Sequence, residues 1–235
     1  MSQVTQSVRS ALSELLSSQQ VGAEGIEVAR GAVIHRQGNA ADHVYFIHHG
    51  QVRLYQVGPD GEERLVEILG AGQWFGCSAL TQSGKYTANA IAATQAQLSK
   101  VSGVRLMELV TLSPQAASAL IRHLAGSVQQ AREEAGRLVF QDCNQRLIAA
   151  MLRFSDSAAA TQQGENTVLH LTHEQLAQAV GAARETISLA LTEMRHANVV
   201  RTGRNRLIFN REALRQLATS PHGSNGKSHE VAQLA

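Results

Sequence analysis

The sequence predicts an α+β protein in which a β-rich N-terminal half, one long helix and a compact C-terminal region follow one another. Three observations predict this order. Short β-branched and aromatic runs between glycines fill residues 26–101, an apolar repeat of three and four residues begins near Ser113, and two short helical patterns meet at Gly181. Evenly spaced short strands separated by turn residues are typical of an all-β roll or barrel.

The composition excludes several classes of protein. The 235 residues carry 21 Lys and Arg against 19 Asp and Glu, and 43% are apolar, whereas a disordered chain has fewer apolar residues and a larger charge imbalance. No apolar run of about eighteen residues and no apolar N-terminal block is present, so we expect a cytoplasmic protein without a membrane partner. Cys77 and Cys143 cannot by themselves form a disulfide framework or a metal cluster, and no metal site is predicted.

The N-terminal part is expected to form a jelly roll over residues 1–112. Residues 7–16 predict a short amphipathic helix before the strands begin, and residues 44–48 and 52–57 are strand-like runs. The turn Pro59-Asp60-Gly61 follows the second of these runs. Proline presets its φ angle and glycine accepts a positive one, so this turn predicts a β-hairpin.

A long helix and hinge are expected over residues 113–141. Pro114 suits the first helical turn, where a missing N–H costs nothing. The apolar repeat predicts a seam that pairs in parallel with a second copy of the chain, and the alternative is a helix packed on its own roll. The seam residues, and candidate dimer interface, are Ile121, Leu124, Val128, Ala131, Ala135 and Leu138.

Residues 142–219 predict a winged helix-turn-helix domain. After a helix over residues 142–153 and a loop over residues 155–165, Thr172 and Gln175 form a capping-box pattern at the start of a helix. Gly181 separates this helix from a second one over residues 184–196, and two short helices joined by a tight turn are typical of a helix-turn-helix. Two short strands around residues 202–205 then predict a wing, and residues 220–235 predict a disordered tail.

The charge of this last region favours double-stranded DNA as a partner. Residues 184–215 contain seven arginines against three glutamates, a local charge of +4. Arginines near phosphates displace condensed counterions, which stabilises binding to DNA.

Segments from both halves of the chain resemble the Crp/Fnr family of transcription regulators. In the C-terminal half these are residues 171–176 (LTHEQL) and 181–188 (GAARETIS). In the β-rich half, residues 30–35 (RGAVIH), 44–50 (VYFIHHG) and 72–76 (GQWFG) follow the glycine framework of the family. The resemblance implies a sensor roll, a dimerisation helix, and a homodimer whose second helices enter the major grooves of a palindromic site. It also implies RNA polymerase and a small-molecule effector as partners.

The resemblance assigns base contacts to the second helix. Arg184 can donate twice to guanine, and Glu185 can accept from cytosine. Leu189 departs from the family, which usually places arginine there, so the third base that is read stays open. The candidate DNA-binding residues are Thr172, His173, Arg184, Glu185, Thr186, Ser188, Leu189, Arg201, Arg204 and Arg206, among which Thr172 and His173 match phosphate-gripping positions.

The effector pocket departs from the cyclic-nucleotide pattern of the family. Cys77 and Ser78 stand in the turn where the family needs a glutamate for the ribose, and Tyr86 and Thr87 replace the Arg-Ser pair that holds the cyclic phosphate. These replacements argue against cyclic AMP, so the effector is unknown or absent and no cofactor is predicted. The candidate pocket residues are Gly76, Cys77, Ser78, Ala79, Tyr86, Thr87, Ala131 and Arg132.

Other sensing or catalytic chemistries would need residues that the chain largely lacks. No cysteine precedes Cys77 to hold an iron–sulfur cluster, and Ser78 stands where the haem-bearing relatives place a histidine. Cys77 leaves open a thiol- or redox-responsive regulator, or an enzyme with a cysteine nucleophile, although no motif supplies the partner groups that an enzyme needs. A nonspecific architectural DNA-binding protein is a further alternative, and we expect no enzymatic activity.

Overall fold

The structure, a computed structural model, describes residues 22–82, 84–140 and 142–219. The helix predicted over residues 7–16 and the tail predicted over residues 220–235 lie outside the described residues, so both stay predictions. None of the helices within the described ranges combines the length and the apolarity that crossing a bilayer requires.

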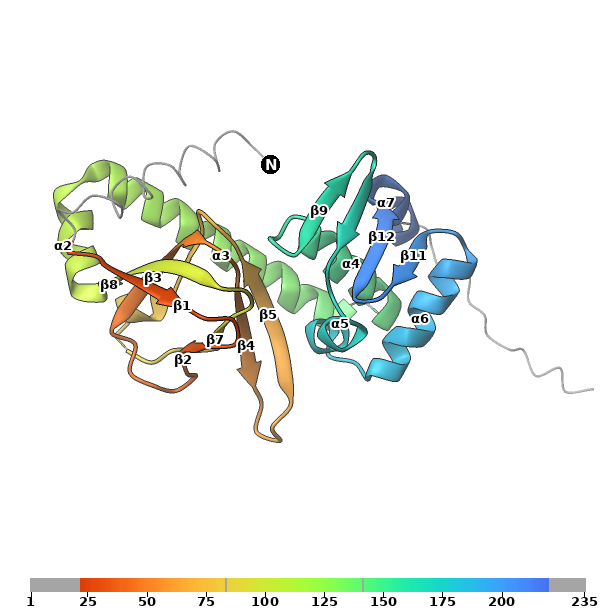
Figure 1. Ribbon diagram of the computed structural model, residues 1–235, viewed down its shortest axis with the longest axis horizontal. Coiled ribbons are helices and arrows are strands. Elements are labelled where there is room, and N and C mark those ends of the chain that lie inside the picture. The colour runs from red at the N-terminus through yellow and green to blue at the C-terminus, as the bar shows by residue number, and fades with distance from the viewer. Residues whose placement is uncertain (1–21, 83, 141, 220–235) are drawn as a thin grey trace, which may run out of the picture.

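Two four-stranded antiparallel sheets form the N-terminal roll (Figure 1). One sheet has the strand order β1-β8-β3-β6, and the other has the order β2-β7-β4-β5. The strands are β1 (Glu24–Val28), β2 (Val33–His35), β3 (His43–His49), β4 (Val52–Val57), β5 (Glu63–Leu69), β6 (Trp74–Phe75), β7 (Asn89–Ala92) and β8 (Ala96–Ser102). The predicted hairpin joins β4 to β5, where Gly58 N donates to Glu62 O over 2.9 Å.

Strand β3 shows how the alternation of side chains builds two cores. Val44 and Phe46 lie on one face and pack with Trp74 and with Leu106 and Leu120 of the two helices that follow the roll. Tyr45 and Ile47 lie on the other face and pack inside the roll. Successive side chains of a strand point to opposite faces, so an apolar run such as this one is buried on both sides. The strand therefore forms the wall between the roll interior and the helical layer.

Helices α2 (Gly103–Leu112) and α3 (Pro114–Phe140) follow the roll. Ser102 caps α2 by accepting from Arg105 N over 3.2 Å, and Pro114 begins α3 as predicted. Ala116 and Leu120 of α3 are buried, and Leu120 packs with Val44, Phe46 and Trp74 of the roll. Further along α3, a stripe of apolar residues is exposed, namely Ile121, Leu124 and Val128 at 65%, 38% and 51% exposure, and Ala131. The side chains of Ala135 and Leu138 lie outside the description.

The C-terminal region packs helices against a sheet of strand order β11-β12-β10-β9. Its elements are α4 (Cys143–Phe154), β9 (Ala160–Gln163), β10 (Asn166–Leu169), α5 (His173–Val180), α6 (Arg184–His196), β11 (Val200–Gly203), β12 (Arg206–Asn210) and α7 (Arg211–Thr219). The prediction of a loop over residues 155–165 is wrong, because strand β9 lies within it. The strand is polar because it pairs only with β10 at the edge of the sheet and is mostly exposed.

Strand β5 lies between the two halves of the molecule (Figure 1). Its pairing with β4 skips Val66, and this bulge brings Leu65 and Ile68 to the same outer face. Both side chains are buried in the core cluster of the C-terminal region, next to helix α5, whereas Leu69 points into the roll. Gln51 Nε2 adds a hydrogen bond to Ala158 O over 2.7 Å.

Candidate nucleic-acid interface and effector pocket

The sequence around Thr172 and Gly181 determines where helix α5 begins and ends. Thr172 Oγ1 accepts from Gln175 N over 3.1 Å, and Gln175 Oε1 accepts from Thr172 N over 2.9 Å, which is the predicted capping box. Gly181 ends the helix with φ at 70°, a left-handed conformation that glycine adopts without a steric penalty. The chain then turns directly into α6, which completes a helix-turn-helix.

Apolar side chains pack the two helices together. Leu176 and Val180 on α5 are buried with Ile187 and Leu191 on α6. This packing leaves the opposite face of α6 in solvent, and Figure 1 shows α6 on the side of the domain that faces away from the roll. The geometry suits insertion of α6 into a groove, because an α-helix fits the major groove of B-DNA.

The exposed face of α6 begins with the predicted base-contacting residues. Arg184, Glu185 and Thr186 are exposed in its first turn, and Leu189 follows at 63% exposure. Ser188 lies on the same side of the helix but is half-buried. A guanidinium and a carboxylate next to each other can read a guanine and a cytosine, whereas Leu189 offers only apolar contact.

His173, the first residue of α5, is tied to α6. Its Nδ1 lies 3.0 Å from Ser188 Oγ. Burial lowers the pKa of His173, and the positive charge of Arg184 lowers it further. The imidazole is therefore neutral at neutral pH, and two of the predicted DNA-binding residues lie in direct contact.

The predicted wing is the hairpin of β11 and β12. Arg201 lies on β11, Arg204 in the turn and Arg206 at the start of β12, and all three are exposed. A Cβ atom on Gly203 would lie 2.8 Å from Arg206 Nε, so the side chain of Arg206 uses the space that this glycine leaves. The wing thus holds three cations on the same domain as α6.

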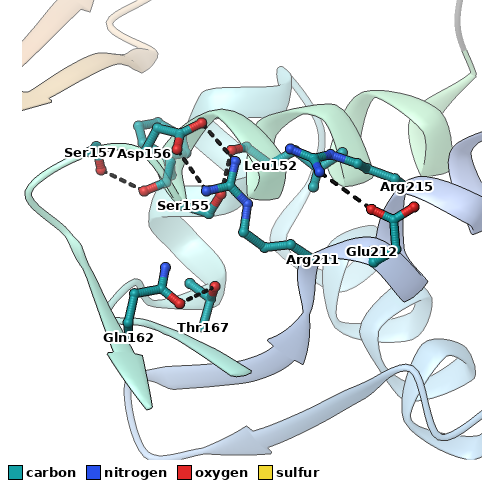
Figure 2. Close-up of polar contacts among 10 residues, drawn as sticks. Leu152, Ser155, Asp156, Ser157, Gln162, Thr167, Arg211, Glu212 and Arg215 are labelled. Carbon is teal, nitrogen blue, oxygen red and sulfur yellow. Dashed lines mark hydrogen bonds and ion pairs between the residues drawn. The ribbon is translucent and has the colours of Figure 1, made fainter. Parts of the chain in front are cut away.

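Two of the seven arginines counted in the sequence take part in ion pairs within the domain. Arg211 donates to both carboxylate oxygens of Asp156, with Nη1–Oδ1 at 2.7 Å and Nη2–Oδ2 at 2.9 Å, and Arg215 Nη1 lies 3.4 Å from Glu212 Oε2 (Figure 2). The first pair ties the start of α7 to the end of α4. These two arginines are therefore less available to a phosphate backbone than the arginines of α6 and the wing.

The predicted effector turn forms the short helix η2 (Cys77–Leu80), which packs against β3 and α2. Gly76 precedes it with φ at 84°, and a Cβ atom there would lie 2.8 Å from His43 O. Cys77, Ser78 and Ala79 are partly buried. Burial, with a smaller contribution from the negative charge of Glu67, raises the pKa of the Cys77 thiol to about 11.

Tyr86 fills part of the roll interior. Its ring is buried and stacks on His35, with 3.7 Å between ring centroids, beside a second stacked pair formed by Tyr45 and Phe75 at 5.0 Å. The Tyr86 hydroxyl donates to His43 O over 2.8 Å and accepts from His43 N over 3.2 Å. The sequence pattern does not reveal this aromatic cluster, because its rings come from four separate segments of the chain.

The remaining predicted pocket residues are not drawn into this cluster. Thr87 is exposed, and Ala131 and Arg132 lie on an exposed part of α3. Among the described residues, no group of three or more histidine, cysteine or acidic side chains is arranged to hold a metal ion.

Both halves of the chain match known protein families. A family model of the cyclic nucleotide-binding domain matches residues 26–112, and a model of the Crp-like helix-turn-helix domain matches residues 145–217. These ranges contain the roll with η2 and the domain that carries α5, α6 and the wing.

Relatives match over most of their length. A CRP-like cAMP-activated global transcriptional regulator of Mycobacterium tuberculosis is 29% identical over 195 residues, 82% of this chain and 87% of the relative. The transcriptional regulator SdrP of Thermus thermophilus is 30% identical over 182 residues, 76% of this chain and 85% of the relative. A solved CRP/FNR family transcriptional regulator from Thermus thermophilus has a TM-score of 0.70 and 28% identity, covering 84% of this chain and 99% of that one. The chain therefore belongs to the Crp/Fnr family of DNA-binding transcription regulators.

Proposed function

We propose that the chain binds a palindromic DNA site as a homodimer and regulates transcription through an effector other than cyclic AMP, or without one. The observation that carries this proposal is the exposed first turn of α6, where Arg184 and Glu185 lie next to each other above a packed helix-turn-helix. Each residue complements one member of a G·C pair in the major groove. RNA polymerase is the further partner that regulation of transcription requires.

Phosphate contacts would position the reading helix. Thr172 and His173 lie at the start of α5, where His173 contacts Ser188 of α6. The wing arginines Arg201, Arg204 and Arg206 belong to the same domain. Helix N-termini and arginines both bind phosphate oxygens. Binding through several cations makes the affinity fall steeply with salt concentration, even where the bases determine the choice of site.

Homodimerisation is supported by the exposed apolar stripe on α3. Ile121, Leu124 and Val128 repeat at the spacing of a two-helix seam, while Leu120 already packs against the roll. Exposed apolar residues in such a row are typical of a protein–protein interface. Two copies related by a two-fold axis would present two α6 helices to two half-sites.

The roll interior supports an effector other than cyclic AMP. Where a cyclic phosphate would need a guanidinium, the Tyr86 ring is stacked on His35, and where a ribose would need a carboxylate, Cys77 carries a neutral thiol. An effector would act by binding one arrangement of the dimer helix and hinge more tightly than another. The raised pKa of Cys77 counts against a thiol-responsive mechanism, because the thiolate is the reactive form.

Selection from random-sequence DNA tests the proposal. Repeated selection by the full chain at physiological salt should enrich a palindrome that binds about a thousand-fold or more tighter than random DNA. Arg184→Ala and Glu185→Ala should each weaken the discrimination between the palindrome and random DNA by about 1–3 kcal/mol in binding free energy. Failure to enrich any sequence would leave the architectural alternative, and an enriched but asymmetric site would refute the homodimeric mode of binding.

A further inference from the structure

One hydrogen bond joins the two helices of the helix-turn-helix on the side expected to meet DNA. His173 Nδ1 and Ser188 Oγ lie 3.0 Å apart. Ser188 is one turn beyond Arg184 and directly precedes the exposed Leu189, so its hydroxyl lies at the edge of the reading face. Ser188 carbonyl oxygen also accepts from Thr192 Oγ1 over 2.9 Å, but that contact leaves Ser188 Oγ unused.

The proton on His173 decides what Ser188 can offer to a base. A neutral imidazole has one N–H and one bare nitrogen, and a serine hydroxyl has one hydrogen and two lone pairs. If Nδ1 is bare, Ser188 must donate its hydrogen to it, and Oγ can then only accept from a base. If Nδ1 carries the hydrogen, Ser188 accepts from it and keeps its own hydrogen for a base acceptor.

A DNA phosphate would select one of these two states. His173 occupies the first turn of α5, where the helix N-terminus attracts anions. A phosphate oxygen offers only lone pairs, so it can bind the Nε2–H form of the ring and not the Nδ1–H form. Burial and the positive charge of Arg184 lower the pKa of His173, which disfavours the doubly protonated ring. With Nε2 donating to phosphate, Nδ1 is bare and accepts from Ser188.

We infer that His173 is a positioning residue that makes Ser188 an acceptor and thereby restricts the base it reads to adenine or cytosine. In the major groove these two bases present an amino group, adenine N6 and cytosine N4, whereas guanine and thymine present only acceptors; adenine also has the acceptor N7. The inference rests on the proposed function, because it needs α6 in the major groove.

Substitution of His173 by a residue that can only donate tests this inference. Selections with the wild-type chain and with Ser188→Ala identify the base position that depends on Ser188, since only that position should lose its preference. Sites in which the amino group of adenine or cytosine is removed from one strand at a time identify the strand that Ser188 contacts. On that strand the wild-type chain should prefer A or C by about fivefold, the effect of one hydrogen bond. His173→Arg keeps a phosphate donor but can only donate to Ser188, so on the same strand cytosine, which has no acceptor in the major groove, should become disfavoured and G or T favoured.

A matched control and a spectroscopic measurement separate this role from a structural one. His196→Arg makes the same change at the exposed C-terminal end of α6 and should leave every base preference unchanged. A loss of preference at all positions in His173→Arg would indicate a structural role and overturn the inference. Nitrogen-15 NMR of the complex should show the His173 ring with its hydrogen on Nε2, and a hydrogen on Nδ1 would overturn the inference.

Failure of the inference is distinguishable from failure of the proposed function. If the wild-type chain enriches a palindrome but prefers G or T, or no base, on the strand that Ser188 contacts, the inference is wrong and the proposed function stands. If the wild-type chain enriches no sequence at all, the proposed function is refuted, and the inference with it.

Discussion

Cys77 illustrates how burial decides the chemistry of a single residue. Its thiol has a pKa raised to about 11 by burial, so at neutral pH the reactive thiolate is scarce. In a Cys143→Ser variant, which leaves one thiol, alkylation of the folded chain should be at least about tenfold slower than alkylation in denaturant. Mass spectrometry after timed iodoacetamide treatment measures both rates. Equal rates would restore the thiol-responsive alternative.

His35 should make the stability of the protein depend on pH. Burial lowers the pKa of His35 to about 4, whereas the unfolded residue titrates near pH 6.5. Between these values the unfolded chain binds a proton that the folded chain does not, so the free energy of unfolding falls as the pH falls below about 6.5. Through His35 alone, lowering the pH from 7 to 5 should lower the free energy of unfolding by about 1–2 kcal/mol.

The variant His35→Phe isolates this contribution. Phenylalanine keeps a ring stacked on Tyr86 but cannot bind a proton. Urea unfolding of the two proteins at pH 7 and pH 5 measures the difference, which cancels the other titrating groups. The same loss of stability on acidification in both proteins would contradict the assignment to His35.

For single residues, the sequence predicted which side chains of α6 are exposed, but it did not predict which residues from distant segments come into contact. Arg184, Glu185 and Leu189 are exposed on α6 because the buried spacing of Ile187 and Leu191 requires it, and that spacing is visible in the sequence. The stacking of Tyr86 on His35 is not visible, since strand pairing brings together rings that are far apart in the chain. The contact of His173 with Ser188 likewise depends on how two helices pack.

Strand β5 is the element that connects the roll to the C-terminal domain. Its adjacent residues Ile68 and Leu69 point to opposite faces, so Ile68 lies in the C-terminal core and Leu69 in the roll core. Both are nearly inaccessible, so either truncation to alanine should cost about 2–5 kcal/mol in the free energy of unfolding. The part of the molecule that is destabilised should differ between the two variants.

Hydrogen exchange measured by mass spectrometry distinguishes these locations. Ile68→Ala should accelerate exchange in α5, which packs against β5, and leave β3 and β8 protected. Leu69→Ala serves as the matched control and should accelerate exchange in the roll strands. The same exchange pattern in both variants would show that β5 does not separate the two cores.

The elements with strong local signals were predicted well, and those defined by tertiary pairing were not. The capping box and Gly181 fixed α5, and the Pro59-Asp60-Gly61 turn fixed the β4–β5 hairpin. Strand β9 lacks an apolar pattern because it lies at the edge of the sheet, pairs only with β10 and is mostly exposed, so its sequence resembles a loop. The bulge at Val66 arises from pairing between strands and leaves no signal in the sequence.

At the scale of the whole molecule, the exposed stripe on α3 predicts the assembly. Ile121, Leu124 and Val128 expose apolar surface to solvent, and covering that surface with a second copy of the chain would be energetically favourable. A charge placed on the seam would have to be buried without a partner, so Ile121→Glu should dissociate the dimer. Because Ile121 is 65% exposed in the single chain, the substitution should leave the fold of each copy intact.

Sedimentation equilibrium at micromolar concentration measures this effect. The wild-type chain should sediment as a dimer and Ile121→Glu as a monomer, while Arg122→Glu, an exposed neighbour off the stripe, should remain dimeric. The monomeric variant can reach only one half-site at a time, so its affinity for a palindrome should fall to that for a single half-site. A wild-type chain that is monomeric under these conditions, or an Ile121→Glu variant that stays dimeric, would contradict the seam as the interface. Loss of the dimer with unchanged affinity for the palindrome would instead show that the two α6 helices do not bind together.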